Sequence, residues 1–307
     1  MNILVTGGAG FIASHLVNAY IKEGHRVVVV DDLSFGKREF LDPNAAFYQM
    51  DIRDEQIAKI LEKENIEIIN HHAAQVSVQA SVKDPVADAN ANIISTLQLI
   101  QKAVKCGVKK FIFASTGGAI YGEQEYFPAD EDHPCKPESP YAISKLSVEH
   151  YLRFYEANSD LKPVIFRYSN IFGPRQNPHG EAGVVAIFCN LLVQGKQPII
   201  NGDGEQTRDF LYVNDLVPAN LIALLPECVG TFNLGTGVES SVNTLTEILV
   251  KLSGNNLSAQ HGPGKPGEQK RSVIDYKKFA AEFGWEPVVP LKEGLIKTFD
   301  YFANGKY

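Results

Sequence analysis

The expected fold of this chain of 307 residues follows from residues 2–13, which read Asn2-Ile3-Leu4-Val5-Thr6-Gly7-Gly8-Ala9-Gly10-Phe11-Ile12-Ala13. Residues 2–6 predict a short buried strand, and an amphipathic helix is expected from Phe11 to about Glu23. Gly7 permits the tight turn between them, and Gly10 lets a pyrophosphate approach the backbone at the helix N-terminus. Ala13 replaces the usual third glycine, and alanine is accepted there. The segment therefore predicts a dinucleotide-binding turn.

A pair of acidic residues follows the second predicted strand. This strand runs from Arg26 to Val30 and ends in Asp31 and Asp32. An acidic residue about 20 positions after the glycines can hydrogen-bond the hydroxyls of the adenosine ribose, and it repels a 2′-phosphate. These residues therefore favour NAD over NADP.

Strands and helices alternate along the first half of the chain. Strands are expected near residues 2–6, 26–30, 46–49, 66–70, 110–115 and 163–167. This alternation predicts an α/β fold with a doubly wound parallel sheet of the Rossmann type. After Arg167 come loops rich in glycine, proline and asparagine around one helix, Val184 to Gln194, and such irregular segments usually hold the substrate.

The predicted domains are interleaved. Residues 210–225 and 231–234 are expected to return to the first domain. We therefore expect an NAD-binding domain of residues 1–168 with returning segments at about 210–236. A smaller α/β substrate-binding domain would be formed mainly by residues 169–209 and 237–307.

Composition excludes several classes of function. The net charge of −7 opposes a large nucleic-acid interface, and no apolar run reaches membrane-spanning length. The first strand begins so near the N-terminus that we expect no signal peptide, and hence a cytoplasmic protein. The four cysteines form no Cys-x-x-Cys pair and are expected to be reduced. No metal site is expected either, because His71 and His72 are adjacent strand residues that point to opposite faces.

Tyr141 and Lys145 form the strongest candidate for chemistry. Pro140 is expected to begin a helix, on which residues four apart share one face. A nearby ammonium favours the phenolate of a tyrosine, whose free pKa is about 10. Alone, this spacing usually means two ordinary helix-surface residues. Here the strand before it ends in Ser115 and Thr116, hydroxyls that we expect at the ligand crevice.

Together these motifs resemble those of the extended short-chain dehydrogenases/reductases, in the same order and over nearly the whole chain. The matching segments are Gly7 to Ile12, His72 to Gln75, Ser115 to Gly122, Ser139 to Tyr141 with Lys145, Arg167 to Asn170, Gly173 to Arg175, and Gly202 to Asp209. Within that family the chain is most similar to nucleotide-sugar epimerases, in particular to prokaryotic UDP-glucose 4-epimerases.

The resemblance implies 4-epimerisation of a UDP-hexose through a transient 4-keto sugar. Tyr141 would remove the proton of the 4-hydroxyl as hydride leaves for NAD, and Lys145 would hold the nicotinamide ribose and keep Tyr141 ionised. Thr116 would hydrogen-bond the same oxygen. Hydride returns to the other face of the sugar, so NAD is regenerated and stays tightly bound. Gly117 and Gly118 stand where dehydratases and decarboxylases of the family place an acid, which favours simple hydride return.

The resemblance also implies two sets of binding residues. For the cofactor these are Gly7, Gly10, Phe11, Ile12, Asp31, Asp32, Asp51, Ile52, Ala73, Ala74, Gln75, Asn92, Ser115, Tyr141, Lys145 and Tyr168. For the substrate they are Thr116, Asn170, Gly183, Val184, Val185, Arg208, Lys265, Glu268 and Ser272. A homodimer is implied through the helices near residues 87–105 and 141–157.

At two positions the sequence differs from the pattern of these relatives, so the identity of the sugar stays open. Lys265 stands where many relatives carry a second arginine for the diphosphate, and a lysine lacks the planar fork of an arginine. Ser272 lies near a position where a small residue admits N-acetylated sugars. A UDP-N-acetylglucosamine or UDP-glucuronate 4-epimerase is therefore an alternative. An NAD-binding sensor or scaffold without catalysis is an alternative of another class.

Overall fold

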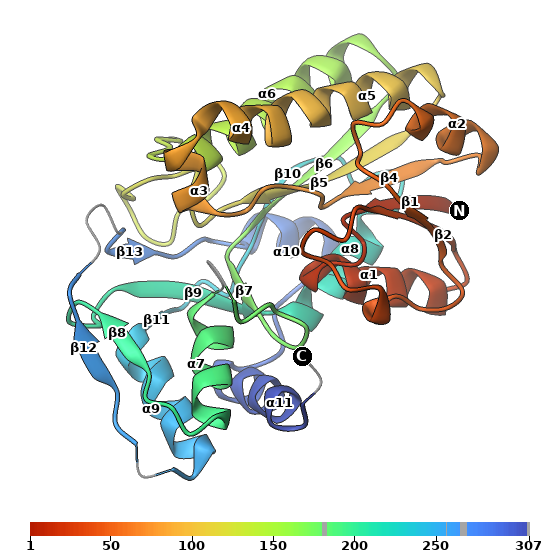
Figure 1. Cartoon of the computed structure of the whole chain (residues 1–307). Coiled ribbons are helices and arrows are strands. Elements are labelled where there is room, and N and C mark those ends of the chain that lie inside the picture. The colour runs from red at the N-terminus through yellow and green to blue at the C-terminus, as the bar shows by residue number, and fades with distance from the viewer. Residues whose placement is uncertain (180–182, 256, 265–268, 306–307) are drawn as a thin grey trace. The chain divides into compact units, whose positions relative to one another are not determined.

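The computed structural model describes residues 1–179, 183–255, 257–264 and 269–305 (Figure 1). The chain divides into two compact units. Unit 1 contains Met1–Ile120, Pro137–Arg167 and Val217–Phe232, and unit 2 contains Tyr121–Lys136, Tyr168–Leu216 and Asn233–Tyr307. Each unit is therefore assembled from segments that are distant in sequence.

Unit 1 is built on a seven-stranded sheet of order β10-β6-β5-β4-β1-β2-β3. Its strands are β1 Asn2–Thr6, β2 Arg26–Asp31, β3 Ala46–Gln49, β4 Ile68–His71, β5 Lys110–Thr116, β6 Lys162–Tyr168 and β10 Gly230–Leu234. Pairing from β5 through β4, β1 and β2 to β3 is parallel, and the apolar residues of these strands are buried. Strands covered on both faces are expected to be apolar almost throughout. The predicted doubly wound parallel sheet is confirmed.

Helices cover both faces of this sheet (Figure 1). They are α1 Phe11–Lys22, α2 Gln56–Lys63, α3 Val78–Lys83, α4 Pro85–Ala89, α5 Ser95–Lys105, α6 Pro140–Asn158 and α8 Leu216–Ile222, with the 3₁₀ turn η1 Arg38–Phe40 and a π-helical turn, η2 Asn90–Ile94, between α4 and α5. In the view, α4, α5 and α6 lie on one face and α1 and α8 on the other. None of the helices in the described part of the chain is long and apolar enough to span a membrane.

The described residues of unit 2 form two small sheets. In the larger one, β9 Thr207–Tyr212 pairs with β7 Asn170–Phe172, β11 Glu239–Ser241 and β13 Arg271–Ser272. In the smaller one, β8 Ile199–Asn201 pairs with β12 Gln260–Gly262. The helices are α7 Val184–Val193, α9 Val242–Ser253, α10 Lys277–Phe283 and α11 Leu291–Ala303, and the 3₁₀ turn η3 is Val213–Asp215.

The return of the chain to unit 1 begins later than the sequence analysis expected. Residues 210–225 were predicted to return together, but Phe210 to Tyr212 pair with β7 inside unit 2 and the return starts at Val217. The apolar pattern of these residues is the same for a strand in either unit. Only the pairing with β7, β11 and β13 assigns β9 to the second unit.

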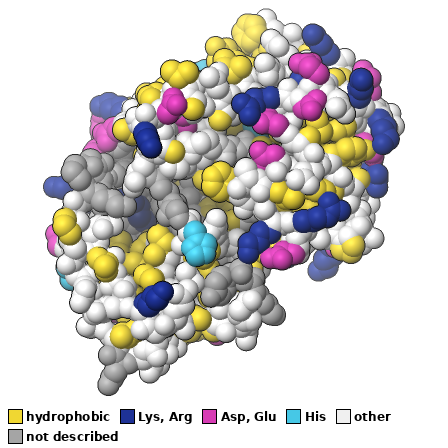
Figure 2. Space-filling model, viewed as in Figure 1, with side chains coloured by type: hydrophobic (Ala, Val, Ile, Leu, Met, Phe, Trp, Pro, Cys, Tyr) yellow, Lys and Arg dark blue, Asp and Glu magenta, His cyan; other side chains and the backbone are white. Residues whose placement is uncertain are grey.

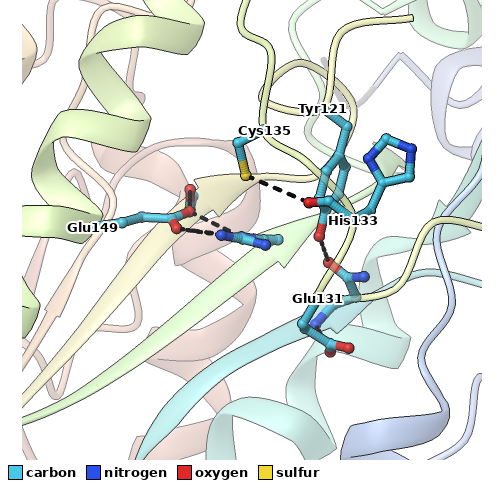
Figure 3. Close-up of polar contacts among 8 residues, drawn as sticks. Tyr121, Glu131, His133, Cys135 and Glu149 are labelled. Atoms are coloured by element: carbon cyan, nitrogen blue, oxygen red, sulfur yellow. Dashed lines mark hydrogen bonds and ion pairs between the residues drawn. The ribbon is translucent and has the colours of Figure 1, made fainter. Parts of the chain in front are cut away.

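The segment 121–136 groups with unit 2, although the sequence analysis placed it in the first domain. Asn233, the residue of β10 at which the last segment of unit 2 begins, accepts at Oδ1 from Tyr121 Oη at 2.8 Å (Figure 3). Its backbone N donates to a carboxylate oxygen of Glu131 at 2.6 Å. Ala129 N donates to Val273 O at 3.0 Å. These bonds join the segment to strands more than 100 residues away, which no local pattern reveals.

Candidate active site

The glycine turn after β1 has the geometry of a phosphate cradle. Gly7 has φ +65°, and a Cβ there would lie 2.7 Å from Ala73 N. Gly10 is the N-cap of α1, so no capping side chain covers the first amides of the helix. A Cβ on Gly10 would lie 3.1 Å from Gly7 O. The turn and the helix N-terminus, which begins at Phe11 and Ile12, therefore fit the pyrophosphate of a dinucleotide.

Asp31 has a structural task besides the expected contact with the adenosine ribose. Its Oδ2 accepts from Ala9 N at 3.0 Å and its Oδ1 from Leu33 N at 2.8 Å. Burial raises the pKa of this carboxyl group. Asp32 is exposed, and its Oδ1 accepts from Ser34 N at 2.8 Å. Each carboxylate oxygen has a second lone pair, so both acids remain able to accept from ribose hydroxyls.

Two of the predicted cofactor residues, Asp51 and Ile52, lie just after the carboxyl end of β3. Asp51 pairs with Arg53, and this hydrogen bond lowers the pKa of the Asp51 carboxyl group. Ile52 is buried in the core cluster of unit 1. Asp51 is thus partly occupied by an ion pair that the sequence analysis did not anticipate.

A chain of side-chain hydrogen bonds runs under the glycine turn. Thr6 Oγ1 lies 2.7 Å from His71 Nδ1, and His71 Nε2 lies 2.9 Å from Thr96 Oγ1, which donates to Asn92 O at 2.8 Å. Burial, with the nearby charge of Lys145, holds the pKa of His71 well below its ordinary value. His71 is therefore a neutral bridge between two threonines. Within the described ranges, no three His, Cys, Asp or Glu residues form a metal-binding group.

Gln75 and Asn92, both predicted to contact the cofactor, are paired. Gln75 N donates to Asn92 Oδ1 at 2.9 Å, and Asn92 Nδ2 donates to Gln75 O at 2.9 Å. Asn92 lies in η2, and π-helical turns are frequent at functional sites. Ala73 and Ala74 connect β4 to this pair. The structure thus joins the loop after β4 to the turn that contains Asn92.

Tyr141 and Lys145 lie on the first turns of α6. Ser139 Oγ caps the helix by accepting from Ala142 N at 3.2 Å, and Pro140 occupies its first turn, as predicted. Lys145 Nζ donates to Ala114 O in β5 at 2.9 Å and lies 5.9 Å from the centroid of the Tyr141 ring. The strand carbonyl thus fixes the ammonium beside the phenol.

The pKa of Tyr141 departs from the expected direction. Burial raises this pKa, and the charge of Asp88 raises it further. Burial also lowers the pKa of Lys145 to about 8, against the opposing charges of Asp88 and Glu149. From the sequence, Lys145 is expected to lower the pKa of Tyr141, but desolvation and the charge of Asp88 arise only in the folded chain. The groups of the chain itself therefore favour the neutral phenol.

Ser115 and Thr116 at the end of β5 have different surroundings. Ser115 is buried and its Oγ donates to Glu149 Oε1, so its hydroxyl is not directed to a crevice as expected. Thr116 is half-buried. Successive side chains of a strand point to opposite faces, which explains the difference. Thr116 therefore remains the candidate for contact with a substrate.

Glu149 and Arg167 form a buried ion pair that the sequence analysis missed. Arg167 Nη2 lies 2.8 Å from Glu149 Oε2, and the two side chains are 2% and 0% exposed (Figure 3, around the label Glu149). Glu149 lies one helical turn after Lys145. Its spacing from Lys145 was the only local signal, because its partner Arg167 lies in a different element, the strand β6.

In unit 2, five of the predicted substrate residues line one pocket of about 380 Å³. These residues are Asn170, Gly183, Val184, Val185 and Arg208. Ser272 is buried in β13, directly paired with Arg208. Tyr168 is buried at the end of β6. Lys265 and Glu268 lie outside the described residues.

Three comparisons with known proteins agree. The profile of the NAD dependent epimerase/dehydratase family matches residues 3–235. A putative UDP-glucose 4-epimerase of Methanocaldococcus jannaschii is 42% identical over 304 residues, which are 98% of either chain. The crystal structure of a UDP-glucose 4-epimerase with UDP-glucose from Thermotoga maritima is 48% identical, with a TM-score of 0.97 over 100% of both chains.

A second solved structure carries a different sugar in its name. The UDP-N-acetylglucosamine 4-epimerase of Methanobrevibacter ruminantium is 34% identical, with a TM-score of 0.94 over 99% of this chain and 98% of that one. The family profile covers most of the sequence, and relatives above 40% identity span its full length. The chain therefore belongs to the NAD-dependent epimerase/dehydratase family.

Proposed function

We propose that this protein is an enzyme that interconverts UDP-glucose and UDP-galactose by NAD-dependent epimerisation at carbon 4. The observation that carries the proposal is the placement of Lys145. Its ammonium donates to Ala114 O of β5 and is thereby held beside the ring of Tyr141 on α6. Relatives named UDP-glucose 4-epimerase support the choice of sugar. The non-catalytic alternative is disfavoured because Tyr141, Lys145 and Thr116 are all present.

The residues of unit 1 fit NAD. The glycine turn would hold the pyrophosphate, Asp31 and Asp32 the adenosine ribose, and Lys145 the nicotinamide ribose. NAD supplies the acceptor and donor of hydride at carbon 4, and the charge of its oxidised ring favours a neighbouring phenolate. Tyr141 takes the proton of the sugar 4-hydroxyl and later returns it, while Thr116 hydrogen-bonds the same oxygen.

The test of this proposal is turnover by the purified protein. UDP-galactose, UDP-N-acetylgalactosamine and UDP-galacturonate are supplied separately, without added NAD, and products are identified by NMR. We expect UDP-galactose to yield UDP-glucose. Conversion of the N-acetylated sugar alone would instead support the alternative that the buried, small Ser272 beside Arg208 suggests. No conversion of any sugar, even with NAD supplied, would refute the proposed function.

Arg208 is proposed to bind the diphosphate of the substrate. Arginine can grip phosphate oxygens with two charge-assisted hydrogen bonds. Losing a hydrogen bond to a charged group costs about 1.5–3 kcal/mol, so we expect Arg208→Leu to raise KM roughly 10- to 100-fold. Steady-state kinetics provide the measurement, with Arg208→Lys as a matched variant of intermediate effect. An unchanged KM in Arg208→Leu would exclude this role.

We also propose that the protein is a homodimer through the helical face of unit 1. Ile94, Ile143, Tyr151 and Phe154 are 45%, 49%, 43% and 57% exposed on η2 and α6. Figure 2 shows hydrophobic side chains along the upper edge of the molecule, over the helices of this face. An apolar patch of this kind is typical of a protein interface. The predicted cytoplasmic location remains a prediction.

Charge placed on this face should separate the dimer. Ile143→Asp combined with Phe154→Asp would bury two carboxylates without partners in such an interface. We expect light scattering after size exclusion to give the mass of one chain for this variant and of two chains for the wild type. Val288→Asp, at a residue 76% exposed in unit 2, is the control. A monomeric wild type would contradict the proposal.

A further inference from the structure

Asp88 is a buried acid in unit 1 that the mechanism above does not use. It lies in α4 and is 1% exposed. Its Oδ2 accepts from Ser144 Oγ at 2.7 Å, and its Oδ1 accepts from Gln75 Nε2 and Asn92 Nδ2, each at 2.9 Å. The carboxylate thus connects the helix that carries Tyr141 and Lys145 to the loop after β4 and to η2.

We propose that Asp88 is a positioning residue of this active site, whose fixed negative charge sets the pH range in which Tyr141 and Lys145 work. The inference rests on the proposed function, because that function gives Tyr141 and Lys145 their roles in the reaction. It concerns a residue that touches neither the proposed sugar site nor the reacting atoms.

The hydrogen-bond donors around Asp88 explain why its negative charge acts on Tyr141 and Lys145. All three are neutral, a hydroxyl and two amides, whereas the other buried acid of this region, Glu149, is paired with Arg167. A carboxylate surrounded by neutral donors keeps its full field in a medium of low dielectric constant. Of these two acids, Asp88 is therefore the one whose charge is not compensated by an arginine.

Several charged or titratable groups face Lys145. They are Asp88 from α4, Tyr141 and Glu149 from α6, His71 from the end of β4, and His72 directly after it. After burial, the charge of Asp88 is the next influence on both groups, raising the pKa of Tyr141 and opposing the lowering at Lys145. His71 is buried and His72 half-buried, and desolvation lowers the pKa of both, so they contribute no positive charge near neutral pH. Loss of the Asp88 charge should therefore move both groups in the same direction.

The test replaces Asp88 by Asn, which preserves size and removes the charge. We expect the whole bell-shaped dependence of kcat on pH to move to lower pH by about 1 unit, since a nearby charge shifts a pKa by this order. Ser144→Ala is the matched control, because it removes one hydrogen bond to Asp88 and leaves the charge. Its pH profile should not move. An unmoved profile in Asp88→Asn, or equal shifts in both variants, would overturn the proposal.

A second measurement does not depend on turnover. Lysines labelled with ¹³C at Cε are titrated by NMR, and the Lys145 signal is assigned by its loss in Lys145→Met. The pKa of about 8 in the wild type should fall by about 1 unit in Asp88→Asn. If Asp88→Asn does not fold, Asp88→Ser removes the same charge and should give the same shift. A wild type without epimerase activity would refute the proposed function, whereas an unchanged Lys145 titration would refute the inference itself.

Discussion

Replacing Tyr141 by Phe is expected to lower kcat by about 10³-fold, within the range that general acid–base catalysis contributes. The phenyl ring keeps the packing of the half-buried side chain and loses only the hydroxyl that would exchange a proton with the sugar. Because the pyrophosphate cradle lies at the glycine turn, we expect bound NAD and KM to change little. The measurement is kcat in both directions together with the NAD content of the purified protein.

Tyr151→Phe provides the matched control. It makes the same chemical change on the same helix, at a side chain that is 43% exposed. We expect its kcat to remain within about 2-fold of wild type, because the ring that would pack in the proposed interface is kept and the lost hydroxyl lies outside the proposed site. Full activity of Tyr141→Phe would show that another group moves the proton, and the proposed mechanism would be abandoned.

Replacing Arg167 by Met is expected to cost about 3–5 kcal/mol of the free energy of unfolding, because it leaves a buried carboxylate without its cation. Glu149 is 0% exposed, and Arg167 Nε and Nη2 both donate to it. Glu149 also accepts from Ser115 in the strand that ends at Thr116. The measurement is urea unfolding followed by far-UV circular dichroism.

Two further variants separate the ion pair from the general effect of a mutation. Glu293→Gln removes an exposed pair with Lys297 in α11 and should cost less than about 0.5 kcal/mol. The double variant Glu149→Leu/Arg167→Met removes both buried charges and should recover most of the loss. If Arg167→Met unfolds at the same urea concentration as Glu293→Gln, the buried pair contributes far less than its geometry indicates.

Local patterns were sufficient for the sheet of unit 1. The six strands predicted between residues 2 and 167 appear within two residues of their expected positions, and the helix at Pro140 begins where predicted. Each of these elements is specified by its own residues, through apolar runs, glycine turns and a proline at a helix start. The strand β9 and the segment 121–136 were assigned to the wrong unit, because their partners lie far away in the chain.

The buried acids illustrate the same limit within the site. Asp88 precedes Asn92 by four residues, a spacing that predicts a contact but no role. Its contact with Ser144 spans 56 positions and required the fold. The pairing of Glu149 with Arg167 likewise required the fold, because the two residues lie in different elements. Charged residues near a predicted site are therefore ambiguous until burial decides whether they face solvent or one another.

The sequence by itself determined the order of the elements, the glycine turn, and the common helix face of Tyr141 and Lys145, because these depend only on backbone geometry over a few residues. The tertiary structure decided which acids surround that pair, that Ser115 faces Glu149, and in which direction the pKa of Tyr141 moves. Desolvation and charge depend on every segment that packs around a group. Those segments are distant in sequence, so their effect exists only in the folded chain.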